Sequence, residues 1–255
     1  MTSYRKTLVG AAVTAATRAS PGTITIPGDK GGVLVAIELQ VFGTLETIVN
    51  SGGLVELEND AVDWKPFQFY THGLTVVTSG AAKAHPTRIP VHKKLPPNST
   101  VTIYYTPQDD QSQKLAVTLC WETGINFNEG QETLAMTGIG AAITQVTVAA
   151  KHVTIAIPAE KGGTLRAIQV QVWGTLETVV NSGGLVAITN DSADMTPFEF
   201  YTQSQTCLTC GAVELEPTVI PCTKPCPSRS NMYADYTPQD NQSQKLSITL
   251  IWTKS

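Results

Sequence analysis

The sequence contains one segment twice. Pro27 to Thr123 align with Pro158 to Lys254 at a constant offset of 131 residues and without a gap, and 53 of the 97 paired positions are identical. Solenoid repeats have periods of roughly 20–50 residues, so this period corresponds to a whole domain. A chain of 255 residues therefore divides into two homologous domains, each long enough to bury its own core.

Each copy carries the residue patterns of β-strands. In the first copy, the pattern predicts strands at Thr23–Ile26, Val33–Phe42, Leu54–Glu58, Phe67–Tyr70, Thr87–Val91, Thr100–Tyr105 and Leu115–Trp121. Asn50–Gly53 has the composition of a turn, and the polar segment Pro107–Gln113 is expected to join the last two strands as a hairpin with a long loop. Val, Thr and Pro disfavour helices throughout, and only Glu129–Met136 could form a turn or two of helix.

Seven or eight strands in about 120 residues, separated by frequent turn signals, predict an all-β fold. We expect two tandem homologous antiparallel β-sandwich or jelly-roll domains. The first spans residues 1–124, a linker spans 125–137 and the second spans 138–255.

The first twenty residues have the features of a signal peptide, because Arg5 and Lys6 precede a short apolar run. However, Gly10–Thr14 align with Gly140–Thr144 in the middle of the chain, where no signal peptide can lie. We therefore interpret this stretch as the opening strand of the first domain and expect synthesis in the cytoplasm, with a cleaved signal as the alternative. No apolar run approaches the roughly 18 residues that a transmembrane helix requires.

The strongest chemical signal is confined to the second copy. Cys207, Cys210, Cys222 and Cys226 form a Cys-x-x-Cys pair followed by a Cys-x-x-x-Cys pair. Four thiolates at this spacing could hold a structural Zn²⁺, whereas one or two disulfides and free thiols are the alternatives. The paired positions in the first copy are Val76, Ser79, Val91 and Leu95, so the shared fold does not need these cysteines.

Composition and motifs exclude several functions. A net charge of −4 gives no electrostatic basis for nucleic-acid binding. The sequence has no nucleophile elbow, zinc-protease motif, P-loop or dinucleotide fingerprint, so we do not expect an enzyme. The shared polar residues Glu46, Glu177, Asp109 and Asp240 would anchor a ligand site present in both domains, or they are turn and strand residues, which is the reading that we favour.

The weakly charged surface points to contacts with identical neighbours or to a location outside a cell. Charged residues make up 15% of the chain, against about 25% in typical domains. Two similar β-sandwiches with such a surface resemble viral capsid proteins built from two tandem jelly rolls. In that family, paired barrels in one chain let a trimer imitate a hexamer. The two barrels are usually far diverged, and their similarity here suggests a more recent duplication.

The resemblance implies a self-assembling structural protein, a major capsid or capsid-associated subunit of a virion, with itself and possibly other structural subunits as partners. Duplication supports the same expectation, because a surface that is present twice can form nearly equivalent contacts. An extracellular filament or surface-layer subunit is one alternative. A tandem carbohydrate-binding protein is another, for which Trp64, Trp121, Trp173 and Trp252 would be the candidate platforms.

Overall fold

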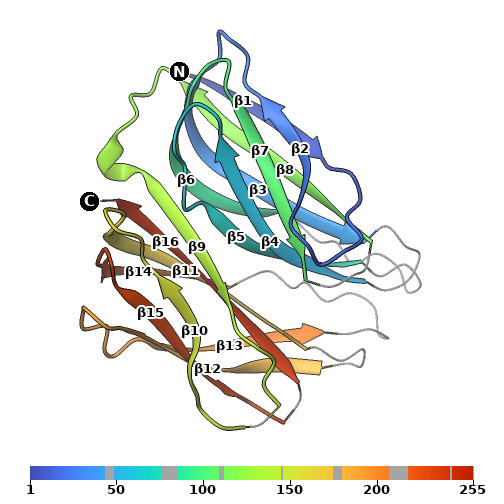
Figure 1. Cartoon of the computed structure of the whole chain (residues 1–255), viewed down its shortest axis with the longest axis vertical. Helices are drawn as coiled ribbons and strands as arrows, with labels where there is room; N and C mark the ends of the chain where they lie inside the picture. The colour runs from blue at the N-terminus through green and yellow to red at the C-terminus, as the bar shows by residue number, and fades with distance from the viewer. Residues whose placement is uncertain are drawn as a thin grey trace.

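The computed structural model contains two β-sandwiches, which Figure 1 shows one above the other. It describes all residues except 44–48, 76–85, 109–111, 145, 175–179, 207–217, 242 and 255. The strands of the first domain are β1 (Thr2–Val9), β2 (Ala19–Thr25), β3 (Gly32–Gly43), β4 (Val49–Asn59), β5 (Gln68–Thr75), β6 (Thr87–Leu95), β7 (Thr100–Pro107) and β8 (Gln113–Thr123). Those of the second are β9 (Thr133–Ile139), β10 (Ala149–Ala156), β11 (Gly163–Gly174), β12 (Val180–Asn190), β13 (Glu199–Thr206), β14 (Thr218–Cys226), β15 (Asn231–Pro238) and β16 (Gln244–Lys254).

Both domains have the same strand order. In the first, sheet 1A has the order β1-β8-β3-β6 and sheet 1B has the order β2-β7-β4-β5. In the second, sheet 2A has the order β9-β16-β11-β14 and sheet 2B has the order β10-β15-β12-β13. Neighbouring strands in every sheet are antiparallel. Consecutive strands thus cross repeatedly between two four-stranded sheets, which is the winding of a jelly roll and confirms the predicted fold class.

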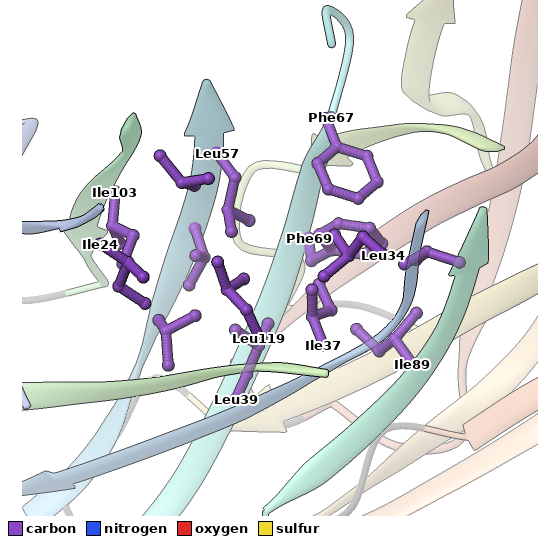
Figure 2. Packing of buried hydrophobic residues seen from close by; sticks show 14 of the residues in the cluster. Ile24, Leu34, Ile37, Leu39, Leu57, Phe67, Phe69, Ile89, Ile103 and Leu119 are labelled. Atoms are coloured by element: carbon purple, nitrogen blue, oxygen red, sulfur yellow. The ribbon is translucent and has the colours of Figure 1, made fainter. Parts of the chain in front are cut away.

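The core of each domain lies between its two sheets. Alternate side chains of facing strands point inward, and in the first domain they form the cluster in Figure 2, which includes Ile37, Leu57, Phe69, Ile103 and Leu119. The second domain has a corresponding cluster with Ile168, Ile188, Ala234 and Leu250. The repeated period-2 pattern therefore gives two separate cores.

The expected turn and hairpin were wrong. Asn50–Gly53 lies inside β4, where Gly53 pairs with Thr71 and Pro107. A Cβ at Gly53 would lie 2.2 Å from the carbonyl oxygen of Thr106, so glycine here allows close packing of strands. β7 and β8 do not pair with each other, because β7 belongs to sheet 1B and β8 to sheet 1A.

The ends of the domains differ in part from the expected boundaries. Thr2–Val9 forms β1 and pairs with β8, so this stretch is an opening strand, while Gly10–Thr14 follow it. β9 begins at Thr133, inside the expected linker 125–137, and pairs with β16. Before it, Glu129–Gln131 form one 3₁₀ turn, where the sequence allowed a short helix. Within the described residues, no helix has the length and apolar character to cross a membrane.

A buried hydrogen-bond network recurs in both domains and accounts for several shared residues. The side-chain carbonyl of Gln113 accepts a bond from the Gly52 N–H at 2.9 Å. The hydroxyl of Tyr105 lies 2.7 Å from the same oxygen and 2.8 Å from the carbonyl of Gly52. Gln244, Gly183 and Tyr236 repeat these contacts at 2.9, 2.8 and 2.9 Å. The network connects the end of sheet A to sheet B in each sandwich.

We expect Gln113→Leu to lower the free energy of unfolding by about 2 kcal/mol, because a buried N–H loses its acceptor. Gln244→Leu should have an effect of similar size, and the two effects should add because the sites lie in separate cores. Urea denaturation followed by tryptophan fluorescence measures this. The control is Lys114→Gln on the same strand, and an equally small change in all variants would contradict a structural role for the network.

Candidate functional site

A side-chain contact joins the two domains. β5 of sheet 1B lies against the outer face of sheet 2A, as Figure 1 shows where β5 approaches β9 and β16. The ring of Tyr70 on β5 stacks on that of Trp173 on β11, with centroids 4.9 Å apart and planes at 12°. Both side chains are buried, at 2% and 6% exposure. An aromatic pair thus occupies the centre of this contact.

Backbone bonds join the edge of sheet 2A to the start of β5. β9 is an edge strand, and the N–H of Ala135 donates to the carbonyl of Pro66 at 3.1 Å. Phe67 and Ala135 form a parallel bridge. The hydroxyl of Thr137 donates to the carbonyl of Gln68 at 3.3 Å. Strand edges present unpaired polar groups, and here the first domain satisfies part of such an edge.

The middle of the contact is polar as well as aromatic. Gln169 donates from Nε2 to the carbonyl of Tyr70 at 3.3 Å, and the hydroxyls of Thr137 and Thr249 lie 2.7 Å apart. Gln169 and Thr249 are almost fully buried, at 2% and 1% exposure. Ala135 and Ile251 belong to the same buried cluster as the core of the first domain. The contact is therefore continuous with a hydrophobic core.

Charged groups lie at the margin of the contact. Lys161 forms an ion pair with Asp63 at 2.9 Å. Although partial burial opposes it, hydrogen bonds from Lys161 and the Lys65 backbone lower the pKa of Asp63 below its ordinary value. Such pairs contribute little net stability at a surface, but they fix the relative position of the two domains.

Among the residues that the structure describes, Lys93 is the one charged residue whose side chain is fully buried. Its Nζ donates to the carbonyl of Trp64 at 2.9 Å and to the carboxylate of Glu132 at 2.8 Å, and its side chain has 0% exposure. Desolvation lowers the pKa of Lys93 to about 8, against the opposing effect of Glu132. The ammonium therefore holds the segment before β9 against the first domain at a cost in desolvation.

The predicted cysteine group is only partly within the described residues. Cys207 and Cys210 lie outside them. Cys222 and Cys226 lie on β14 with free thiols, Cys226 within the core of the second domain and Cys222 packed against it. Burial raises the pKa of Cys222 and raises that of Cys226 to about 12. No group of three or more metal-binding side chains occurs among the described residues, and the four-cysteine zinc site remains a prediction.

The other candidate ligand residues are buried, partly buried or outside the described part of the chain. Trp64, Trp121, Trp173 and Trp252 are at most 6% exposed, so none of these rings forms an open platform for a sugar. Trp121 and Trp252 donate to the carbonyls of Lys30 and Lys161 at 2.7 and 2.6 Å. Glu46, Glu177 and Asp109 are not described. Asp240 accepts a bond from Gln244 at 2.7 Å, next to the recurring buried network.

A shallow depression of about 370 Å³ lies over the loop after β4. It is lined by Glu58 to Lys65. The loop is held by its own bonds, since Asn59 accepts from the N–H groups of Ala61 and Val62 in the manner of an Asx turn. Its polar lining is thus the lining of a structured turn.

Sequence reasoning missed the domain contact as a site. The sequence pattern places Tyr70 in a predicted strand and makes Trp173 a candidate sugar platform. It does not indicate that the two rings meet. The available signal was the difference between the copies, because sheet 2A has Ala135, Gln169 and Ile251 where sheet 1A has Arg5, Glu38 and Cys120. A less charged face in one copy indicates that this face is covered.

Tyr70→Ala should lower the free energy of unfolding by about 3 kcal/mol, because it removes a buried ring from an aromatic stack. Tyr201→Ala, at the same position of the second domain, should change it by less than about 0.5 kcal/mol, since Tyr201 is 57% exposed. Denaturation of the dissociated chain at low concentration compares the two. Equal effects would show that Tyr70 does not hold the domains together.

The buried ammonium of Lys93 gives a second expectation, in pH dependence. Its pKa is about 8 in the folded chain against an ordinary value of 10.5, so the unfolded chain binds more protons between these values and stability rises with pH there. Relative to Lys93→Met, the wild type should gain up to about 3 kcal/mol across this interval of pH. Unfolding in urea across this range measures the difference. A constant difference would show that Lys93 titrates normally.

Comparison with protein-family models and with curated proteins finds no match for this sequence. Among solved structures, the chain is similar to PNGF-II at 8% identity and a TM-score of 0.45, over 96% of this chain and 65% of PNGF-II. It is similar to the major capsid protein P2 from bacteriophage PM2 at 11% identity and a TM-score of 0.35, over 99% and 98% of the chains. It is also similar to the N-terminal CBM22-1–CBM22-2 tandem domain from Paenibacillus barcinonensis Xyn10C at 12% identity and a TM-score of 0.26, over 100% and 93%. The function proposed below therefore depends on the contacts within this chain.

Proposed function

We propose that this protein is a self-assembling structural subunit of a virion, a major capsid or capsid-associated protein whose duplicated jelly rolls build a symmetric shell. The observation that carries the proposal is the contact between the two homologous domains. It has a buried aromatic centre, Tyr70 on Trp173, and an ion pair at its margin, which is the anatomy of a stable protein–protein interface.

Duplication extends this contact beyond one chain. The partners in the contact are β5 of the first domain and sheet 2A of the second. Each chain also carries the homologous elements, β13 and sheet 1A, because the two domains have the same strand order. A chain that contains both partners of a contact twice can join further chains by the same kind of contact, and such contacts produce rings, shells or filaments.

The role requires no catalysis, no resident cofactor and no direct binding of nucleic acid. The proposed partners are further copies of the chain and other structural subunits of the particle, and the proposed location is the virion, after synthesis in the host cytoplasm. A carbohydrate-binding role is less well supported, since the four tryptophans are at most 6% exposed.

The purified chain should form large, regular assemblies. We expect multi-angle light scattering to give a mass many times that of the 27.2 kDa chain, with the assembled fraction increasing with concentration, and negative-stain electron microscopy to show closed particles. Open filaments would instead favour an extracellular filament or surface-layer subunit. A strict monomer at millimolar concentration would contradict self-assembly.

A further inference from the structure

The second domain carries an uncovered copy of the face that β5 uses inside the chain. Tyr201 on β13 occupies the repeat position of Tyr70, yet it is 57% exposed where Tyr70 is 2% exposed. Phe198 is only partly buried, whereas Phe67 at the equivalent position is 2% exposed. Aromatic residues at an exposed sheet edge are costly to leave in water, and in the first domain the same residues are covered.

The first domain carries an uncovered copy of the face that receives β5. β1 is the edge strand of sheet 1A as β9 is of sheet 2A. Arg5 pairs with Cys120 as Ala135 pairs with Ile251, so the N–H of Arg5 points outward from the edge as that of Ala135 does. The local geometry is also preserved, since the hydroxyls of Thr7 and Thr118 lie 2.8 Å apart, as those of Thr137 and Thr249 do at 2.7 Å.

We propose that the β13 face of one copy docks onto β1 and the outer face of sheet 1A of a second copy, and so repeats between chains the contact that joins the domains within a chain. This inference rests on the proposed function and names its contact surface. Pro197, Glu199 and Tyr201 would take the places of Pro66, Gln68 and Tyr70. Arg5 would take the place of Ala135, with its N–H donating to the carbonyl of Pro197.

Charge changes between the copies favour a second copy as the occupant. Inside the chain, Ala135 forms a bridge with Phe67, and Thr137 bonds to the carbonyl of Gln68, so the neutral residues Gln68 and Ala135 lie near each other along this edge. Their equivalents Glu199 and Arg5 have opposite charges. Arg5 is 62% exposed and Glu199 is also exposed, so both can reach a partner. The two charge changes can attract each other only if the β13 face meets sheet 1A. Opposite charges across an interface favour the correct pairing.

The ion pair at the margin has an equivalent that can form between chains. Lys161 and Asp63, the ion pair at the margin, correspond to Lys30 and Asp194, so the pair is kept in type. Hydrogen bonds from Thr196 lower the pKa of Asp194 and keep it ionised.

The contact made by Gln169 needs a different donor. Gln169 donates to the carbonyl of Tyr70, and its equivalent Glu38 has no donor. However, the guanidinium groups of Arg5 and Arg88 both bond to Glu38, so they bring N–H donors to the place where the carbonyl of Tyr201 would lie. Arginine is well suited to this because it presents several donors in a fixed plane.

The contact is heterologous, because each copy offers one β13 face and one sheet 1A face. Such contacts propagate from copy to copy, and they close into a ring or continue as a helix according to the rotation that each contact imposes. Here that rotation is the one already present between the two domains of a chain.

The test uses the full-length chain and two charge reversals. Arg5→Glu alone would place two carboxylates opposite each other across the contact, and Glu199→Arg alone would place two guanidinium groups there. Each single variant should therefore lose assembly in light scattering and electron microscopy. An equimolar mixture should recover it, because contacts between the two variants can pair opposite charges. The double variant Arg5→Glu, Glu199→Arg should also assemble. If the β13 face and sheet 1A do not meet in the assembly, mixing the two variants should not restore assembly.

Tyr201→Ala gives an independent measure. Removal of a central interface aromatic ring should raise the concentration for half-assembly about 30-fold or more. Val148→Ser, another exposed apolar residue at 66% exposure, is the matched control and should leave assembly unchanged. Circular dichroism should show that all variants keep the wild-type fold.

The outcomes separate this inference from the proposed function. If the wild type assembles and the Tyr201 and charge variants assemble equally well, the self-assembling role stands and the docking surface proposed here is wrong. If the wild type stays monomeric up to millimolar concentration, the proposed function itself fails. Loss of assembly in the single variants with recovery on mixing supports both.

Discussion

The stack of Tyr70 on Trp173 decides how the two halves of the chain are arranged. It lies on the outer face of one sheet of the second domain. It is accompanied by a backbone bond from Ala135 and a hydroxyl bond from Thr137 to the start of β5. A jelly roll has two outer faces that can stay in water. When one of them is covered, two independent sandwiches become a single unit with defined free surfaces.

The repeat provides an internal comparison that a single domain lacks. Both cores and both Tyr–Gln–Gly networks lie at the same positions of the repeat, although core residues differ in type at several positions, such as Ile103 and Ala234. The copies differ in charge on their outer faces, where Ala135 and Gln169 replace Arg5 and Glu38. A substitution in the interior disturbs close packing, whereas a substitution on an outer face alters only what can bind there.

Local patterns predicted the strands better than they predicted their partners. Alternation of apolar residues predicted the ends of β3 and of its neighbouring strands to within a few residues. This works because the alternation that buries one face of a strand lies within the strand's own sequence. The pairing of β7 with β8 was predicted wrongly, since crossing between sheets is a property of the whole sandwich. Glycine occurs both in turns and at places where two backbones approach closely. The composition of Asn50–Gly53 is typical of a turn, but Gly53 is required here by the close approach of Thr106.

The sequence alone determined the number of domains, their common all-β fold and the residues of their cores, because repeats and period-2 patterns are written in the order of the residues. Only the tertiary structure showed that β5 covers sheet 2A while β13 and sheet 1A stay uncovered. The outer faces of the two copies differ in charge, but the sequence does not show which strands of the two domains lie against each other. That depends on the short connection between the domains, which brings together one pair of faces and leaves the other pair uncovered.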